Sequence, residues 1–169
     1  MINRMTWQLG DPDFRRAIHS VCDPLAERAA LAGTVGVQVH VASIVGLDKL
    51  GPPAKEIEIV SFGPTQVPDS VESVPVRTVD SLGFEASVKA GSSWIALGDE
   101  QFHVASPEHI LGMCMAAPSL PRSTKWACFM LMRACEGRLD LEEVRGFLKR
   151  SEPALDRQSL LVELAYLAA

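Results

Sequence analysis

Two apolar segments with alternating patterns constrain the fold of this chain most strongly. In VGVQVHVASI, residues 35–44, valines occupy every second position, and KEIEIVSF, residues 55–62, alternates isoleucines with glutamates. A period of two is typical of β-strands that bury one face. The turn residues Gly51, Pro52 and Pro53 stand between the two segments. The sequence therefore predicts two strands in one sheet, joined through a short helix over residues 44–50.

The same signals predict elements along the rest of the chain. The expected elements are a helix from near Asp13 to Ala32–Gly33, a polar loop over 63–75, a strand over 74–82, an ambiguous segment over 84–89, a hairpin over 93–105 that turns at Gly98–Asp99, and helices over 107–117, 124–136, from Asp140, and over 154–168. Strands followed by a run of helices indicate an α+β fold, with a small mixed sheet flanked by helices and a helical C-terminal part. We expect residues 1–118 to form the α+β core and residues 119–169 to pack on it within a single compact domain.

Composition narrows the classes of function. The 169 residues carry a formal net charge of -5, with 47% hydrophobic and 22% charged residues, so no broad basic surface for nucleic acid is expected. No apolar run reaches the length of a membrane span, and residues 1–14 lack the pattern of a signal peptide. We therefore expect a cytoplasmic protein without membrane contact. The four cysteines form no C-x-x-C pair, and we expect them to be buried thiols.

Glu56 and Glu58 are the candidate chemical residues of the second predicted strand. Alternation places both carboxylates on one face, with backbones about 7 Å apart. Such a pair repels itself unless both groups point into water or a cation lies between them. Mg²⁺ takes one or two carboxylates together with substrate phosphates. The sequence leaves both interpretations open, a solvent-facing strand edge and a magnesium site.

The order of segments resembles the minimal nucleotidyltransferases of the DNA polymerase beta-like superfamily, the small bacterial kind often found in toxin–antitoxin pairs. In that family a strand ends in Gly-Gly or Gly-Ser, a short helix and a turn follow, and the next strand carries Asp-x-Asp. Here Ala42–Ser43 falls at the glycine pair and Glu56-Ile57-Glu58 on the acidic strand. The segment Val79-Asp80-Ser81-Leu82 is similar to the family's third acidic motif, which makes Asp80 the third candidate.

Two further segments extend the resemblance over most of residues 35–148. FHVASPEHILGMCMAA, residues 102–117, is similar to a strand that runs into a Ser-Pro-Glu helix start, and EGRLDLEEVRGFL, residues 136–148, is similar to a Gly-Arg-x-Lys-Asp motif. The resemblance implies a sheet of the nucleotidyltransferase kind and Mg²⁺ with an NTP as cofactors. The implied site residues are Glu56 and Glu58 on the metal, Asp80 as the third catalytic acid, and Ala42, Ser43 and Arg138 on the nucleotide.

Four departures from the family pattern weaken its chemistry. Ala42 replaces a glycine that would let phosphate approach the backbone, and glutamates replace the aspartates. Cys114 and Leu139 stand where the family carries lysines, so two cations that could steady phosphate charge are missing. Two hypotheses follow. One is a nucleotidyltransferase fold with reduced or lost Mg-dependent transfer. The other is a non-catalytic interaction or regulatory domain, antitoxin-like or homo-oligomeric, whose partner is another protein or a second copy.

Overall fold

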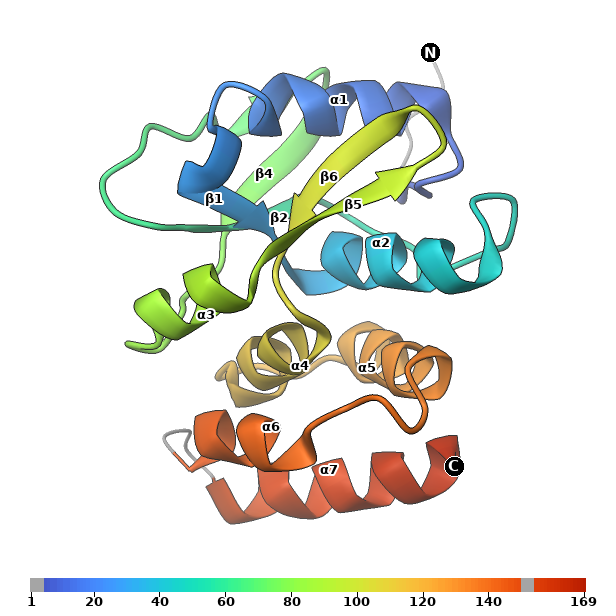
Figure 1. Ribbon diagram of the computed structural model, residues 1–169, viewed down its shortest axis with the longest axis vertical. Helices are drawn as coiled ribbons and strands as arrows, with labels where there is room; N and C mark the ends of the chain where they lie inside the picture. Colours follow the sequence, from blue (N-terminus) through green and yellow to red (C-terminus); the bar gives the residue numbers. More distant parts are fainter. Residues whose placement is uncertain (1–4, 150–153) are drawn as a thin grey trace.

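A six-stranded mixed sheet organises one half of the protein, whose computed structural model describes residues 5–149 and 154–169 (Figure 1). The strands lie in the order β3-β4-β2-β1-β6-β5. Their bounds are β1 Ala29–Leu31, β2 Ile57–Ser61, β3 Ser70–Val71, β4 Val74–Thr78, β5 Ser93–Leu97 and β6 Glu100–Val104. The β2–β4 and β1–β6 pairs are parallel and the other neighbouring pairs are antiparallel. The predicted α+β class is confirmed.

Helices cover both faces of the sheet and form the other half of the protein. Their bounds are α1 Pro12–Cys22, the 3₁₀ turn η1 Ala26–Arg28, α2 Gly33–Val45, α3 Glu85–Gly91, α4 Pro107–Ala116, α5 Arg122–Ala134, α6 Leu141–Leu148 and α7 Ala154–Ala168. Helix α1 lies over one face of the sheet and α2 over the other, with α4 and α5 beyond α2 and then α6 and α7 (Figure 1). None of the described helices has both the length and the apolar character needed to cross a membrane.

Local capping signals predicted several helix starts correctly. The Ser106 hydroxyl accepts the His109 backbone N–H at the start of α4, and Pro107 occupies the first position of that helix. The Asp140 carboxylate accepts backbone N–H groups at the start of α6. These side chains satisfy donors that have no partner within the helix. The hairpin of β5 and β6 also turns where Gly98–Asp99 predicted it.

The prediction of a strand over 35–44 is wrong, because these residues belong to α2. The intervening polar residues of the alternating pattern are buried together with the valines. The Gln38 side-chain amide donates to the carbonyls of Trp7 and Pro52, and His40 Nε2 donates to the Ala105 carbonyl. A helix buried all round carries no amphipathic period, so the alternation was not informative. Burial outweighs the low helix propensity of valine.

Two neighbouring predictions are also corrected. The first helix ends at Cys22, and residues 29–31, which were expected to continue it, form β1 near the middle of the sheet. Residues 44–50 do not form a separate helix, because α2 ends at Val45. The ambiguous segment 84–89 lies mainly in α3.

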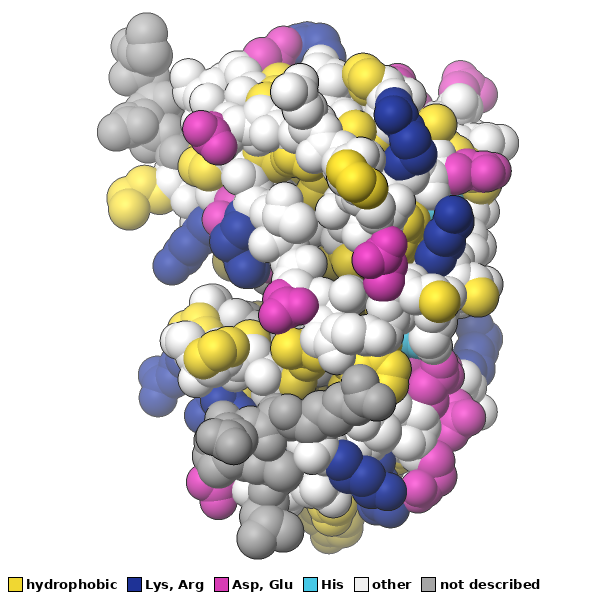
Figure 2. Space-filling model, turned by 90° about the vertical axis from the view of Figure 1, so that its left-hand side faces the viewer, with side chains coloured by type: hydrophobic (Ala, Val, Ile, Leu, Met, Phe, Trp, Pro, Cys, Tyr) yellow, Lys and Arg dark blue, Asp and Glu magenta, His cyan; other side chains and the backbone are white. Residues whose placement is uncertain are grey.

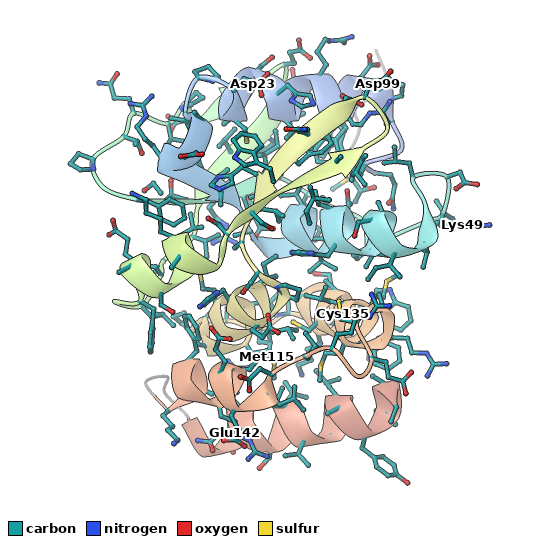
Figure 3. All side chains as sticks on the ribbon, viewed as in Figure 1. Asp23, Lys49, Asp99, Met115, Cys135 and Glu142 are labelled. Atoms are coloured by element: carbon teal, nitrogen blue, oxygen red, sulfur yellow. The ribbon has the colours of Figure 1, made fainter. Side chains whose placement is uncertain are left out.

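The helical half is held together by close contacts between α4 and α6. A β-carbon at Gly112 of α4 would stand 2.5 Å from the ring of Phe147 on α6, so only glycine lets that ring pack at this distance. Side chains fill the space between the α4–α5 layer and the α6–α7 layer, and the fully buried Met115 is among them (Figure 3). The apolar core therefore continues from the sheet into the C-terminal helices.

Candidate functional site

Glu56 and Glu58 lie beside Arg77, which comes from the neighbouring parallel strand. The register of β2 and β4 places Glu58 opposite Arg77. Arg77 Nε donates to Glu56 Oε1 at 2.7 Å, and one of its terminal nitrogens donates to Glu58 Oε2 at 2.6 Å. One guanidinium therefore bridges both carboxylates, which is a strong, charge-assisted arrangement. We call these three residues the acid–arginine cluster.

Glu58 also closes the start of helix α2. Its Oε1 accepts the Thr34 backbone N–H at 2.9 Å, and its backbone carbonyl accepts the Ala32 N–H at 2.9 Å. The N-terminus of a helix favours negative charge, so the Glu58 carboxylate, which comes from β2, acts as a cap for α2. Gly33 makes this possible, since its φ is +56° and a β-carbon there would stand 2.0 Å from Glu58 Oε2.

The two glutamates differ in how far their side chains are buried. The Glu58 side chain is 10% exposed and that of Glu56 is 30% exposed. Burial raises the pKa of Glu58 above its usual value, although the Thr34 N–H and the Arg77 charge oppose that rise. Burial by itself would lower the pKa of Arg77, but its bonds to Glu56 and Glu58 raise it instead, so the guanidinium stays charged.

The acid–arginine cluster does not fit a magnesium ion as it is arranged. Both oxygens of Glu58 are committed, one to the Thr34 N–H and one to Arg77. The guanidinium already supplies the positive charge between the carboxylates that a divalent ion would otherwise supply. Across residues 5–149 and 154–169, no group of three or more His, Cys, Asp or Glu side chains could hold a metal ion. A metal would require Arg77 to leave both carboxylates.

Asp80, the third predicted acid, lies three residues beyond Arg77, after the end of β4. Its carboxylate accepts the Leu82 backbone N–H at 2.8 Å in a local turn, where Leu82 has a φ of +56°. In the described part of the chain, Arg77 forms ion pairs with Glu56 and Glu58 and none with Asp80. The carboxylate of Asp80 is therefore used to shape the turn.

The predicted nucleotide-contact residues do not gather at the acid–arginine cluster. Ala42 and Ser43 lie in the last turns of α2, about 13 Å along the helix axis from its start. The Ser43 hydroxyl donates to the His40 carbonyl, which is a bond within the helix. Arg138 is exposed in the segment between α5 and α6, where its backbone N–H bonds the Cys135 carbonyl.

Three residues of this site were not predicted from the sequence. Gly33 and Thr34 follow the short β1 and begin α2 in a small-residue turn that faces Glu58, the place that the sequence pattern gave to Ala42–Ser43. Arg77 was not predicted because its contact with the acids depends on the parallel register of β2 and β4. An arginine in a predicted strand next to an acidic strand was the available signal, since opposite charges pair across neighbouring strands.

Comparison with models of known protein families finds no match, and neither does comparison with the curated proteins.

Proposed function

We propose that this chain is a nucleotidyltransferase-like domain in which Mg-dependent nucleotidyl transfer is reduced or lost. The order of its elements supports the resemblance described above, with the turn placed differently. Strand β1 leads into α2, which begins at Gly33–Thr34, and the later strand β2 carries Glu58 facing that turn. Glu56 lies one residue before β2. Gly33 is the glycine in this arrangement, so the resemblance no longer depends on Ala42–Ser43.

The main argument for reduced or lost transfer is the position of the Arg77 guanidinium between Glu56 and Glu58. Removing one partner from a hydrogen-bonded charge pair leaves an uncompensated charge, which is costly where the group is buried. A metal–triphosphate would have to displace Arg77 and leave its charge beside the metal. It would also have to compete with the Thr34 N–H for Glu58.

Cys114 adds a second argument for lost transfer. It stands where the resemblance expects a lysine, and it is buried beside Cys128. Its hydrogen bond with Cys128 and its burial raise the pKa of the Cys114 thiol well above its usual value, so the group is neutral at physiological pH. A neutral, buried thiol cannot balance the negative charge of a triphosphate.

The test measures binding and turnover separately. Thermal unfolding is recorded with and without each Mg-NTP, and transfer is followed with a labelled NTP. We expect no stabilisation and no labelled product, whereas a ligand at one hundred times its Kd would add about 2.7 kcal/mol. Product formation by the wild type that disappears in Glu58→Gln, at a temperature where the variant is still folded, would contradict the proposal.

A second candidate function, self-association, is favoured by the outer face of α7. Leu161 and Leu164 of this helix are buried, yet Val162, Tyr166 and Leu167 are 55%, 82% and 56% exposed. These three apolar side chains share the exposed side of α7 with Glu163, and covering them would remove apolar surface from water. We propose that a second copy of the chain covers this face.

Sedimentation velocity over a range of protein concentrations tests this second candidate. We expect a concentration-dependent dimer that Tyr166→Glu abolishes. The matched control is Leu50→Glu, since Leu50 is an equally exposed apolar residue, at 82%, outside α7. A monomer at all concentrations, or equal effects of the two substitutions, would exclude self-association through α7.

A further inference from the structure

An open pocket lies at the edge of the sheet beside the end of α3, away from the acid–arginine cluster. It has a volume of about 220 Å³ and is lined by side chains of η1, α3, β5 and β6. The lining residues are Glu27, Lys89, Ser92, Trp94 and His103. We call it the Trp94 pocket. Its volume is below the range of drug-sized ligand sites, so it would admit a single small ring system.

The pocket holds more hydrogen-bond acceptors than donors. His103 Nδ1 lies 2.7 Å from the Ala29 carbonyl, which can only accept, so this nitrogen carries the hydrogen. In the neutral ring, Nε2 is then an acceptor, and it lies 3.1 Å from the Ser92 hydroxyl. That hydroxyl has one hydrogen, and it donates it to the nearer Lys89 carbonyl at 2.6 Å. The Lys89 carbonyl also accepts the Ser92 backbone N–H, so one hydroxyl hydrogen is shared between two acceptors, and His103 Nε2 has room for a further donor from a ligand.

An aromatic wall stands next to this acceptor. The rings of Trp94 and His103 are stacked with centroids 4.8 Å apart and an interplanar angle of 29°. His103 is buried, while Trp94 is 44% exposed. A flat ring in the pocket can pack against this pair, and such aromatic contacts contribute beyond the area they bury.

The rim of the pocket carries one charge of each sign. Glu27 and Lys89 are both exposed, and in the part of the chain that the structure describes neither forms an ion pair. Glu27 offers a further acceptor for an amino group. Lys89 offers the only cation of the lining, which suits an anionic substituent on the ligand.

We propose that the Trp94 pocket binds a small amino-heterocycle of the nucleobase class. Its exocyclic amino group donates to His103 Nε2, and its ring packs against the wall formed by Trp94 and His103. A phosphate on the ligand would lie toward Lys89. This site is separate from the acid–arginine cluster, and it holds whether or not the proposed loss of nucleotidyl transfer is correct.

The test follows the indole N–H signals of the three tryptophans by NMR while adenosine is added at up to millimolar concentrations. The Trp94 signal is the one that Trp94→Phe removes. We expect it to shift saturably while the signals of Trp7 and Trp126 stay in place. Purine riboside lacks the amino group, and we expect it to bind about ten-fold more weakly. The comparison of the two ligands uses the unmodified protein, and Trp94→Phe serves only to assign the Trp94 signal.

Variants then locate the site. Trp94→Ala should weaken adenosine binding about ten-fold or more, followed by the ligand's own signals. Trp126→Ala is the matched control, since Trp126 is 54% exposed and stacks on Phe129, and it should leave binding unchanged. AMP that binds more tightly than adenosine, with the gain lost in Lys89→Gln, would identify the ligand as a nucleotide. Equal binding of both would identify a nucleoside or free base.

The proposal is overturned by any of three results. These are no shift of the Trp94 signal, equal affinity for adenosine and purine riboside, or equal losses in Trp94→Ala and Trp126→Ala.

Discussion

The acid–arginine cluster and the Trp94 pocket are two polar sites on the same sheet, and they differ in how their hydrogen bonds are satisfied. In the cluster, Arg77 and the Thr34 N–H take up the carboxylate oxygens of Glu58. In the Trp94 pocket, one Ser92 hydrogen faces two acceptors, one of which is His103 Nε2. A polar group whose partners inside the fold are complete gains little from a ligand, whereas an acceptor that shares its donor with another acceptor gains more. The Glu56–Glu58 pair, which the sequence suggested as catalytic, thus belongs to the site whose hydrogen bonds are complete. We call the acid–arginine cluster the closed site and the Trp94 pocket the open site.

One face of the protein carries side chains of both charges. On the face shown in Figure 2, acidic and basic side chains are interspersed with apolar ones, and the face is hollowed where the sheet half meets the helical half. Long-range steering of a highly charged substrate needs a patch of one charge.

The largest expected effect is that of Gly33→Ala, which tests how tightly the closed site is built. The new β-carbon would meet the Glu58 carboxylate, and the positive φ would be strained. We expect a loss of several kcal/mol in the free energy of unfolding, measured by urea denaturation. Gly146→Ala is the control, because nothing lies within 4 Å of the added carbon, and α6 should gain about 0.5–1 kcal/mol. Equal effects of the two substitutions would refute the close contact.

How much could be predicted from the sequence depends on whether a signal was local. The β5–β6 turn and the caps Ser106 and Asp140 were predicted because each rests on neighbouring residues. The short β1, Ala-Ala-Leu, contains too few residues to show a period. Helix α2 was mistaken for a strand because all-round burial removes the helical pattern.

The candidate site follows the same rule. Glu56 and Glu58 were predicted to share a face from period-2 spacing, and both do contact the Arg77 guanidinium, although Glu56 lies one residue before the start of β2. The place of Arg77 was not predicted, because it depends on a parallel register that only the folded sheet sets. The error at Ala42–Ser43 followed from treating α2 as a strand, which moved the turn away from Gly33.

Arg77→Ala has the next largest expected effect, and it tests whether the charge of Arg77 stabilises the acid–arginine cluster. It leaves two carboxylates on one face without a cation, so we expect a loss of about 1–3 kcal/mol near neutral pH, reduced because Arg77 is half exposed. The Glu58 pKa should rise further without Arg77. The loss should therefore shrink as the pH falls through that pKa, since protonated Glu58 needs no cation. Urea denaturation at about pH 5 and about pH 8 measures it. A loss that grows on acidification would be contrary to this account.

Glu58→Gln has a smaller effect, whose sign is set by burial. A carboxyl whose folded pKa is raised stabilises the fold below its unfolded pKa, and that contribution is lost as the pH rises through the folded pKa. Burial raises the Glu58 pKa. The stability of the wild type relative to Glu58→Gln should therefore fall as the pH rises. Thermal unfolding of both proteins between about pH 5 and about pH 8 measures this difference. A difference that does not change with pH would show that Glu58 titrates normally.

The smallest effect is expected at the open site. Glu27→Gln changes an exposed rim residue without an ion pair in the described chain, so the free energy of unfolding should stay within about 0.5 kcal/mol. Chemical denaturation checks this. A loss as large as that of Arg77→Ala would mean that Glu27 is a structural residue and that the two sites do not differ as described.

The most direct test of the central claim, that Arg77 holds the acid pair in place of a metal, is calorimetric titration of Mg²⁺ into the wild type, Arg77→Ala and the double variant Arg77→Ala/Glu58→Gln. The account predicts no binding heat for the wild type, a saturable signal for Arg77→Ala, and loss of that signal in the double variant. Saturable Mg²⁺ binding to the wild type that Glu58→Gln abolishes would contradict it.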